Sequence, residues 1–413
     1  MRILFVAMPG SVHTARWITQ ISNLGWDIHL FASTPEPVHP DFRNLTIYGF
    51  SSFRPKELDR SVRIRGLFPL RRGASTLGRR ANYYLPWVSP WVLAGMIRWL
   101  KPDIVHSMEI QHAGYLTLAA REVLKGKFPP WIVTNWGSDI YLYGRLSEHQ
   151  EKIKAVMSAC DYYHTECHRD VELAKEFGFK GEVFPVLPNT GGFDIERTRQ
   201  LRQPGLTSAR RLIALKGYQL WAYRALVGLR AIELCAELLK EKGYRIAIYL
   251  ASQDTKIAAE LLAKSSGLLI DIIPRVPHEQ MLRLHGQARV SIGLSISDAL
   301  STSALEAMVM GSFPIQSNTS CLEELIRDGQ SGMLVHPEDP EAVAEALRRA
   351  VTDDELVDRA AEINARIAAE HLDQSVVRPQ VVQMYERIAA RRAHSKKGTI
   401  ADENRSLSQG QYL

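Results

Sequence analysis

Short apolar segments alternate with longer amphipathic segments along this chain, and the alternation occurs twice, on either side of a stretch rich in proline and glycine at residues 185–210. Apolar runs of roughly four to eight residues are typical of buried strands, and apolar residues spaced every three to four positions are typical of helices. Strands separated by helices pair in parallel and carry helices on both faces of the sheet. The alternation therefore predicts an α/β protein with two doubly wound parallel-sheet domains.

The breaks in the pattern give the expected boundaries. Expected strands span residues 2–8, 27–31, 103–106, 131–134, 161–164 and 182–184, then 211–215, 245–250, 268–272, 290–293, 313–316 and 333–335, with a long helix at 221–242. We place the first domain at 1–195, a linker at 196–210, the second domain at 211–370, a helix at 371–392 that crosses back to the first domain, and a disordered tail at 393–413. Because ligands bind outside the carboxyl ends of parallel strands, two such domains predict a site in the cleft between them.

The length of 413 residues exceeds that of one ordinary core and supports two domains. The first apolar run, 3–8, is too short for a signal peptide, and the segment 83–100 contains two prolines and an arginine, which argue against a membrane-spanning helix. The cysteines at 160, 167, 235 and 321 show neither metal-site spacing nor a dense disulfide framework. We therefore interpret them as reduced and expect a cytoplasmic protein.

The formal charge of +6 is modest, and we expect no nucleic-acid partner. Nine basic residues nevertheless fall between Ser51 and Arg80, and tyrosines and tryptophans follow at 83, 84, 87 and 91. Basic residues interleaved with aromatic ones favour an anionic membrane surface or an anionic acceptor. The stretch Arg54–Trp91 therefore predicts peripheral membrane association, with a solvated surface loop as the equally weighted alternative.

The most informative segment is residues 295–314, SISDALSTSALEAMVMGSFP. A strand is expected to end near Ser295, and a helix to begin with Ser301, Thr302 and Ser303. The free N–H groups and the dipole at a helix N-terminus favour an anion, so these three residues are candidate phosphate ligands.

Two acids flank this helix start, Asp298 and Glu306. Glu306 is placed to accept hydrogen bonds from ribose or sugar hydroxyls in a cleft. The alternative is local: Ser301 or Ser303 caps the helix and Glu306 serves as the acid of a capping box.

A longer set of residues follows Glu306 in a fixed order. The set comprises Glu306-Ala307-Met308, Gly311, Pro314-Ile315, Glu324-Leu325-Ile326, Asp328-Gly329 and Gly332-Met333-Leu334-Val335. It resembles the C-terminal signature of the retaining glycosyltransferase family 4, the group 1 enzymes of GT-B fold, and Pro188–Asp194 is similar to the hinge of that family. The resemblance implies two Rossmann-like domains facing each other across a cleft. It also implies retaining transfer of a sugar from a nucleotide-diphosphate sugar to an acceptor hydroxyl, without a metal or other cofactor.

The resemblance also implies roles for the two acids. Glu306 matches the family glutamate that contacts the nucleotide ribose. Asp298 matches the glutamate near the donor sugar but is one methylene shorter, and we take it as a catalytic candidate.

In the first domain, Pro9–Trp17 is similar to the family loop beneath the phosphates and sugar of the donor, which implies that Gly10 and His13 face that donor. A surface helix start is the alternative for His13. Asp139 lies in a Gly137-Ser138-Asp139 variant common in the family, and it is the third catalytic candidate. Trp136 stands where many members have histidine.

The family's Gly-Arg…Lys-Gly pair, which holds the diphosphate, is altered here to the segment 216–224. A metal-free diphosphate site needs cations. We predict Arg224 first and Lys216 second as those cations, with a surface arginine as the alternative for Arg224. We also include Arg275 among the donor-binding candidates.

The sequence lacks the main motifs of several other classes of enzyme. There is no Gly-x-Gly-x-x-Gly fingerprint, Walker loop or Asp-x-Asp motif. Two alternatives to a transferase stay open, because fold alone does not give function. One is a non-catalytic sugar-nucleotide-binding or scaffold protein, and the other is a nucleotide-sugar epimerase. The sugar, base and acceptor are not predicted.

Overall fold

The computed structural model describes residues 1–49, 54–66 and 88–409, with side chains up to residue 392. The first sheet is eight-stranded in the order β4-β3-β2-β1-β5-β6-β7-β8, and every neighbouring pair is parallel. Its strands are β1 (Arg2–Ala7), β2 (Asp27–Ala32), β3 (Thr46–Gly49), β4 (Arg63–Gly66), β5 (Ile104–Met108), β6 (Trp131–Thr134), β7 (Tyr162–His164) and β8 (Glu182–Val183). The predicted parallel sheet is confirmed.

Helices cover both faces of this sheet, since its central strands are apolar on both sides. The N-terminal domain contains α1 (Val12–Thr19), α3 (Val88–Leu100), η1 (Ile110–Gly114), α4 (Tyr115–Leu124), α5 (Ser138–Tyr141), η2 (Tyr143–Arg145), α6 (Ser147–Ala159) and α7 (His168–Glu176). One core joins α1 and the C-terminal helix to the sheet, and the other joins α3, α4 and α6 to the opposite face.

The second sheet is six-stranded and again wholly parallel, in the order β11-β10-β9-β12-β13-β14. Its strands are β9 (Leu212–Lys216), β10 (Arg245–Tyr249), β11 (Leu269–Ile273), β12 (Val290–Gly293), β13 (Phe313–Ser317) and β14 (Met333–Val335). The helices are α9 (Ala225–Leu234), α10 (Ala236–Glu241), α11 (Gln253–Ser266), α12 (His278–Gln287), α13 (Thr302–Met310), α14 (Pro340–Thr352) and α15 (Asp354–Ile367). The predicted doubly wound architecture is therefore present in both halves.

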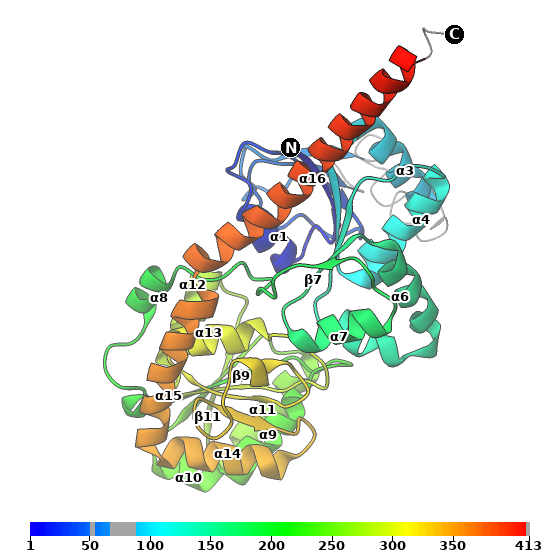
Figure 1. The fold of residues 1–413 in the computed structure, drawn as a ribbon. Helices are drawn as coiled ribbons and strands as arrows, with labels where there is room; N and C mark the ends of the chain where they lie inside the picture. The colour runs from blue at the N-terminus through cyan, green and yellow to red at the C-terminus, as the bar shows by residue number, and fades with distance from the viewer. Residues whose placement is uncertain (50–53, 67–87, 410–413) are drawn as a thin grey trace.

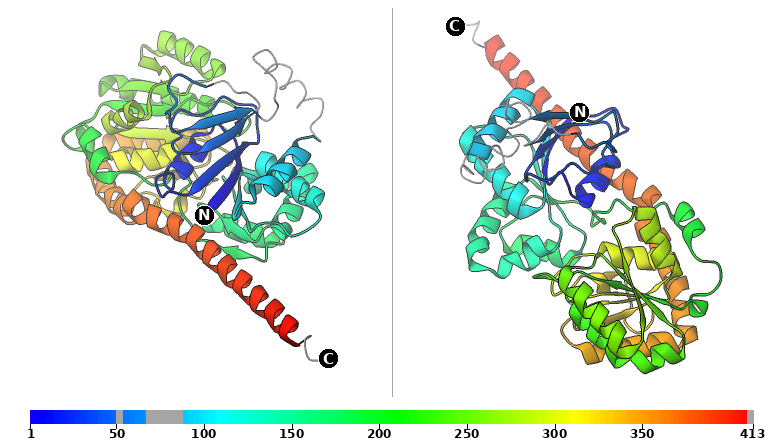
Figure 2. Two further views of the ribbon diagram at one scale, coloured as in Figure 1. Left: turned by 90° about the horizontal axis from the view of Figure 1, so that it is seen from above. Right: turned by 180° about the vertical axis from the view of Figure 1, so that it is seen from behind.

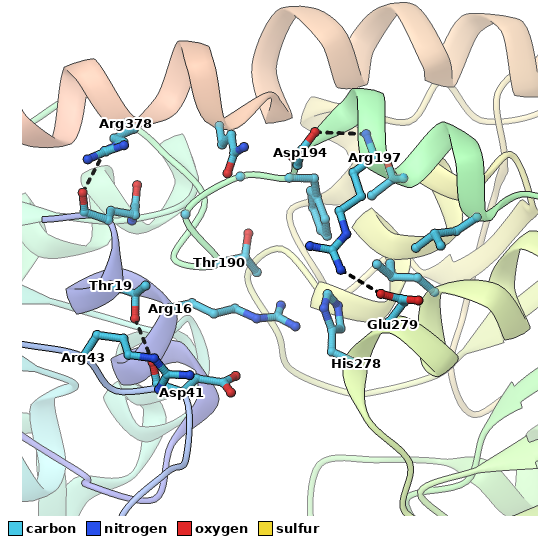
Figure 3. Close-up of a pocket in the computed structure, with 18 of the residues that line it drawn as sticks. Arg16, Thr19, Asp41, Arg43, Thr190, Asp194, Arg197, His278, Glu279 and Arg378 are labelled. Carbon is cyan, nitrogen blue, oxygen red and sulfur yellow. Dashed lines mark hydrogen bonds and ion pairs between the residues drawn. The ribbon is translucent and has the colours of Figure 1, made fainter. Parts of the chain in front are cut away.

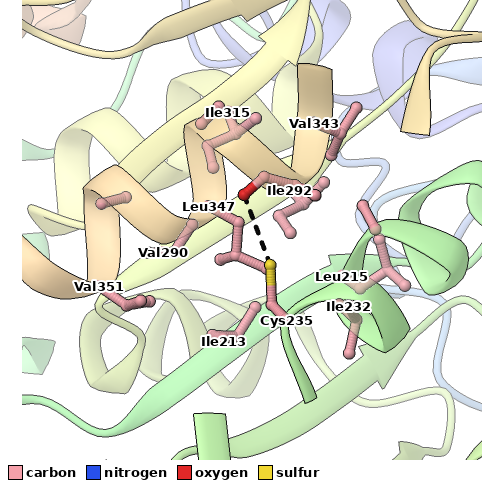
Figure 4. Close-up of a cluster of buried hydrophobic side chains, with 14 of the residues drawn as sticks. Ile213, Leu215, Ile232, Cys235, Val290, Ile292, Ile315, Val343, Leu347 and Val351 are labelled. Carbon is pink, nitrogen blue, oxygen red and sulfur yellow. Dashed lines mark hydrogen bonds between the residues drawn. The ribbon is translucent and has the colours of Figure 1, made fainter. Parts of the chain in front are cut away.

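The core of this domain lies between the sheet and the helices α9 and α14 (Figure 4). Cys235 lies inside it, and its Sγ donates to the carbonyl oxygen of Ala344 at 3.4 Å. Cys235 also ends α9, so the long helix expected at 221–242 is divided into α9 and α10.

Two chain segments connect the domains, and they pair with each other. Phe193 donates its N–H to Leu372 at 2.7 Å and accepts from the N–H of Gln374 at 2.8 Å. The first segment continues into α8 (Ile195–Leu201) and a 3-10 turn, η3 (Thr207–Ala209); the second leads from η5 (Ala368–Leu372) into α16. The paired segments act as one hinge strip.

The C-terminal helix α16 (Gln374–Gln409) runs from the hinge along the N-terminal domain and projects beyond it (Figures 1 and 2). Its buried residues Val381, Tyr385 and Ile388 pack in the same core as α1. We expected disorder from residue 393 onward, but the structure continues the helix to Gln409. The stretch contains no proline, which would remove a helix hydrogen bond, and its one glycine, Gly398, weakens a helix without ending it.

Two further differences concern strands and cysteines. The strands β3 and β4 were not expected, because both are only four residues long and β4 is largely exposed. Cys160 and Cys235 are buried free thiols, as expected, but Cys167 and Cys321 form a disulfide, so the prediction that all four are reduced was wrong. The two partners belong to different domains, and no sequence spacing could reveal that folding brings them together.

No helix in the described part of the chain is both long enough and apolar enough to span a membrane. Within the predicted membrane-contacting stretch, Arg71, Arg72, Arg79, Arg80 and Trp87 lie outside the described residues.

Candidate active site

The carboxyl ends of the central strands of both sheets face the same space between the domains. In the first sheet the strand order changes direction between β1 and β5, and in the second between β9 and β12. Such switch points are where parallel sheets hold ligands. The four candidates follow or end these strands: Lys216 is the last residue of β9, Asp298 lies in the loop after β12, and His13 and Asp139 lie in α1 and α5, the helices that follow β1 and β6.

Glu306 lies at the centre of this interface and is only 5% exposed. Its carboxylate accepts from His278 Nε2 at 2.7 Å, and Arg16 of the opposite domain lies 3.6 Å away. Burial alone would raise the pKa of Glu306, but the hydrogen bond and charge of His278, with the charge of Arg16, lower it to about 2. The carboxylate is therefore ionised at neutral pH.

Lys216 lies at the N-terminus of α13. Its Nζ donates to Ser301 Oγ at 3.4 Å, and Ser301 shares a 3.1 Å hydrogen bond with Ser303 Oγ. Burial lowers the pKa of Lys216, and the negative charges of Asp298 and Glu306 oppose that shift. A cation, two hydroxyls and a helix N-terminus thus face one point, which suits a phosphate.

Asp298 is half-buried in the loop that leads into α13. Burial raises its pKa, and the charges of Lys216 and Arg169 oppose the rise. Nearby, Thr302 Oγ1 is buried without a hydrogen-bond partner among the described residues. An unpaired buried hydroxyl is costly, so a polar ligand at this point would stabilise it.

His13 faces the same site from α1. Burial and the charges of Arg16 and Lys216 lower its pKa to about 4, although Glu306 opposes them. Its ring lies 5.3 Å from that of Trp136, centroid to centroid. Neither His13 Nδ1 nor Trp136 Nε1 has a hydrogen-bond partner in the described part of the chain, so both ring nitrogens are buried and unsatisfied.

Asp139 is buried and engaged with backbone. Its Oδ1 accepts from Trp136 N at 2.8 Å and its Oδ2 from Ile110 N at 3.1 Å. Burial and the nearby Glu109 hold its pKa well above the usual range. These contacts join the loops after β5 and β6, so the geometry favours a positioning role for Asp139.

Glu109 holds the neighbouring loop. It adopts φ 76°, which is rare for a residue with a Cβ, and its carboxylate accepts from the N–H groups of Gln111, His112 and Ala113. Strained backbone of this kind is concentrated at functional sites.

Three predicted donor ligands do not converge with the others. Arg224 Nε pairs with Glu338 at 2.9 Å, and Arg224 also donates to carbonyls near the start of α9. Arg275 is exposed in the loop between β11 and α12. Gly10 packs against another loop, since a Cβ there would lie 2.9 Å from the carbonyl oxygen of Pro37.

The two domains also touch directly across the cleft. Ser297 Oγ donates to Ser138 Oγ at 2.9 Å, and Arg169 donates to the carbonyl oxygen of Asp298 at 3.0 Å. The Arg169 guanidinium stacks over the Tyr141 ring at 3.8 Å. The structure is therefore a closed arrangement in which N-terminal residues support the loop that carries Asp298.

Two family profiles match this chain. The profile of the glycosyl transferases group 1 matches residues 229–366, which include Glu306, and the glycosyl transferase 4-like profile matches residues 85–165. Together they cover more than half of the sequence. The resemblance to the group 1 glycosyltransferases that the sequence predicts is therefore confirmed.

Two curated proteins that are similar to part of this chain are D-inositol 3-phosphate glycosyltransferases. The one from Nocardioides sp. is 32% identical over 99 residues, which are 24% of this chain and 22% of the relative. The one from Corynebacterium urealyticum is 30% identical over 112 residues, which are 27% of this chain and 26% of the relative. The chain thus spans only about a quarter of the length of these relatives.

Solved structures show the same fold over 94% of the chain. Sucrose-phosphate synthase from Thermosynechococcus elongatus has a TM-score of 0.68 at 14% identity, over 94% of this chain and all of that one. Anabaena HepE, solved with UDP-glucose, has a TM-score of 0.63 at 13% identity, over 94% of this chain and 99% of that one. The GT-B architecture expected from the sequence is confirmed.

With the fold established, the capping-box alternative for Glu306 can be tested on its geometry. Ser301 is the N-cap residue of α13, but its side chain makes no capping bond. Glu306 is the fifth residue of the helix, too far along to reach back to the cap. The capping-box alternative was wrong, and the Glu306 carboxylate instead contacts His278 of its own domain and Arg16 of the opposite domain.

Sequence reasoning missed His278 and Arg169. Both lie at the start of helices and contact residues far away in the chain, so no local pattern signals them. The one sequence signal that could have drawn attention to Arg169 is that this cation has no acidic residue four positions further along its helix.

A cavity of about 820 Å³ continues the cleft toward the hinge strip. Arg16 of α1 and His278 of α12 face it from the two domains (Figure 3). On the hinge side it is lined by Thr190 and by Arg378 of α16, which donates to the Gln20 carbonyl at 2.9 Å. Arg16 and His278, which line this cavity, both contact the Glu306 carboxylate, so the cavity adjoins Glu306.

Proposed function

We propose that this chain transfers a sugar from a nucleotide-diphosphate sugar to an acceptor hydroxyl. The observation that carries the proposal is the meeting of Lys216, the α13 N-terminus and Glu306 with His13 and Arg16 across one cleft. A cation beside a helix N-terminus suits the diphosphate, and an ionised buried carboxylate suits ribose hydroxyls. The UDP and UDP-glucose complexes of Anabaena HepE support a nucleotide-sugar donor.

In this proposal the protein acts through electrostatics and positioning. Lys216 and the N–H groups of α13 stabilise the charge that develops on the leaving diphosphate. Arg16 adds a second cation, so the site needs no metal for charge compensation. Asp298 lies next to the reacting sugar, and neutral His13 hydrogen-bonds a sugar hydroxyl.

We further propose retention of configuration. The acceptor then attacks the face that the diphosphate leaves, and a donor phosphate oxygen takes the proton of the acceptor hydroxyl. Closure of the cleft excludes water and holds the reactants close together.

The direct test is turnover of UDP-, GDP- and dTDP-sugars by the full chain, without and then with candidate acceptors. Slow release of nucleoside diphosphate and free sugar without acceptor is the expected result, with a Lys216→Met variant as the inactive reference. NMR of the glycoside product would show whether the anomeric configuration is retained.

The same assay separates the alternatives. A scaffold protein would bind a nucleotide sugar, with a rise in melting temperature, but release no product. An epimerase would return an intact nucleotide sugar with altered stereochemistry. Either outcome would replace the transferase proposal.

We also propose a cytoplasmic protein with peripheral membrane contact through α3. The exposed face of α3 carries Trp91, Arg98 and Trp99, the tryptophans being 62% and 65% exposed. This helix lies at the end of the N-terminal domain far from the C-terminal domain (Figure 1). Amphipathic tryptophans beside cations favour an anionic lipid surface.

Co-sedimentation with vesicles tests this contact. We expect binding to vesicles with anionic phosphatidylglycerol, release at high salt, and no binding to neutral phosphatidylcholine vesicles. Replacing Trp91 and Trp99 by serine should abolish binding, while Trp221→Ser, an exposed tryptophan of the other domain, should not. Absence of binding to anionic vesicles at low salt would favour a soluble acceptor and no lipid contact.

A further inference from the structure

The disulfide between Cys167 and Cys321 joins the two domains at a point separate from the hinge. The two residues are 154 positions apart, both are completely buried, and their Cα atoms are 6.1 Å apart, within the range that disulfides require. Cys167 precedes α7 of the N-terminal domain, and Cys321 follows β13 of the C-terminal domain.

The disulfide lies among the contacts that close the cleft. Glu324 of the C-terminal domain accepts from the backbone N–H and from Nδ1 of His168, both at 2.8 Å. The following residue, Arg169, donates to the carbonyl oxygens of Asp298 and Thr319. The Cys321 N–H donates to Ala299, next to Asp298. A change at the cysteine pair therefore acts on the segment that carries the candidate catalytic acid.

The hinge alone leaves the domains free to move. Its two segments are paired through Phe193, so they form a single strip about which the domains can rotate. A covalent bond formed by residues outside that strip removes this freedom. Other contacts across the interface, among them the Ser297–Ser138 hydrogen bond and the contact between the Tyr143 and Trp221 rings, are non-covalent and break when the domains separate.

We propose that Cys167 and Cys321 form a reversible thiol–disulfide site that fixes the cleft closed when oxidised and lets it open when reduced. The bond itself does not depend on the proposed function; its effect on nucleotide exchange rests on that function.

The redox partner is a small-molecule thiol–disulfide couple such as glutathione. In the oxidising direction, a thiolate of the open protein attacks the glutathione disulfide and releases one glutathione thiolate. The second protein thiolate then attacks the mixed disulfide and releases another. The protein loses two electrons, and the two thiol protons end on two glutathione molecules.

The other two cysteines are natural controls. Cys160 and Cys235 are each buried within one domain. Burial raises the pKa of Cys160, and it raises that of Cys235 to about 11, so both thiols stay protonated and unreactive at neutral pH.

The first experiment follows the bond without any nucleotide. The full chain is equilibrated in glutathione buffers of stepped redox ratio, the free thiols are alkylated, and non-reduced tryptic peptides are measured by mass spectrometry. EDTA is present throughout, because the two sulfurs and a Glu324 oxygen lie within 4.8 Å of one another and could bind a metal when reduced. We expect one reversible transition to a linked 167–321 peptide, with Cys160 and Cys235 unlinked. Absence of that peptide at every ratio would overturn the proposal.

The second experiment measures domain movement and its consequence. We expect small-angle scattering to show a larger radius of gyration after reduction, and stopped-flow to show at least tenfold faster nucleoside diphosphate release. Cys167→Ser with Cys321→Ser should behave as the reduced protein under all conditions, whereas Cys160→Ala with Cys235→Ala should keep the redox response. A redox response that persists in the Cys167 and Cys321 variant contradicts the proposal. If the bond and the scattering change occur but no nucleotide sugar is bound, the proposed function fails and the redox site stands.

Discussion

Glu306 is the residue on which the donor assignment can be tested most directly. Its carboxylate is ionised and already meets His278 and Arg16, so ribose hydroxyls would join an existing charged network. Glu306→Gln replaces a charged acceptor with a weaker neutral one, and we expect nucleoside diphosphate affinity to fall by about 1–3 kcal/mol. Isothermal titration calorimetry measures the loss. Glu233→Gln, an exposed change on α9, is the control, and equal affinities for both variants and the native protein would contradict the assignment.

The cation that holds the diphosphate is a choice between Lys216 and Arg224. The sequence favours Arg224, but its guanidinium pairs with Glu338, 114 residues later, whereas Lys216 reaches the α13 N-terminus. We therefore expect Lys216→Met to weaken nucleoside diphosphate binding by about tenfold or more while leaving nucleoside binding nearly unchanged. Titrations of both ligands into Lys216→Met and Arg224→Ala check this. If only Arg224→Ala weakened binding of the nucleoside diphosphate while leaving nucleoside binding unchanged, Arg224 would be the cation that holds the diphosphate.

At the scale of elements, α16 is fastened to the N-terminal domain by a buried chain of hydrogen bonds. Trp17 Nε1 donates to Tyr385 Oη at 2.8 Å, and the Tyr385 hydroxyl lies 2.8 Å from His106 Nδ1. Since Tyr385 accepts from Trp17, it donates to His106, whose Nε2–H then donates to Thr134 Oγ1 at 2.7 Å. Tyr385→Phe leaves two buried nitrogens unpaired, and we expect a loss of about 1–3 kcal/mol in the free energy of unfolding.

Urea unfolding measures this loss, with Tyr141→Phe as the control, since Tyr141 lies in the same domain but away from α16 and keeps its ring beneath Arg169. In the same chain of hydrogen bonds, the Thr134 hydroxyl donates to His164 Nδ1 at 3.3 Å. An unchanged stability of the Tyr385 variant would show that water replaces the lost hydroxyl and that packing alone holds α16.

The same chain of hydrogen bonds predicts that the stability of the protein depends on pH. Burial lowers the pKa of His164 to about 3, so the folded protein holds it neutral while the unfolded chain titrates near 6.5. The stability that this histidine contributes is complete above about pH 6.5 and is lost as the pH falls toward 3. The stability advantage of the native protein over His164→Asn should therefore shrink by about 1.4 kcal/mol per pH unit below 6.5. A constant difference between pH 7 and 5 in urea titrations would contradict the buried neutral state.

The sequence predicts best those strands and helices whose apolar residues recur at regular spacing over many positions. Both parallel sheets follow from apolar strands alternating with helices, and the place of Glu306 on the helix after β12 follows from motif order. The short strand β4, largely exposed, carries no such pattern. The Cys167–Cys321 pair and the contact of Arg169 with Asp298 depend on how two domains meet, which local sequence does not encode.

At the scale of the whole molecule, closure of the cleft depends on one glycine. Gly137 has φ +94°, and a Cβ at this position would lie 2.3 Å from the backbone nitrogen of Ala299 in the opposite domain. No side-chain rotation relieves a clash with backbone, so the two loops can meet only if residue 137 is glycine. The Ser138–Ser297 hydrogen bond adjoins the same contact.

Gly137→Ala should therefore hold the domains apart while leaving each domain folded. We expect a larger radius of gyration in small-angle scattering and at least a tenfold lower turnover of the nucleotide sugar, since the cleft no longer aligns His13 with Asp298. Gly95→Ala on α3 is the matched control, because its Cβ would meet nothing within 4 Å. That change should leave scattering and turnover as in the native protein. Normal turnover by Gly137→Ala with the domains held apart would show that the reaction does not need the closed arrangement, and a variant that closes as the native protein does would show that the clash with the Ala299 backbone is relieved.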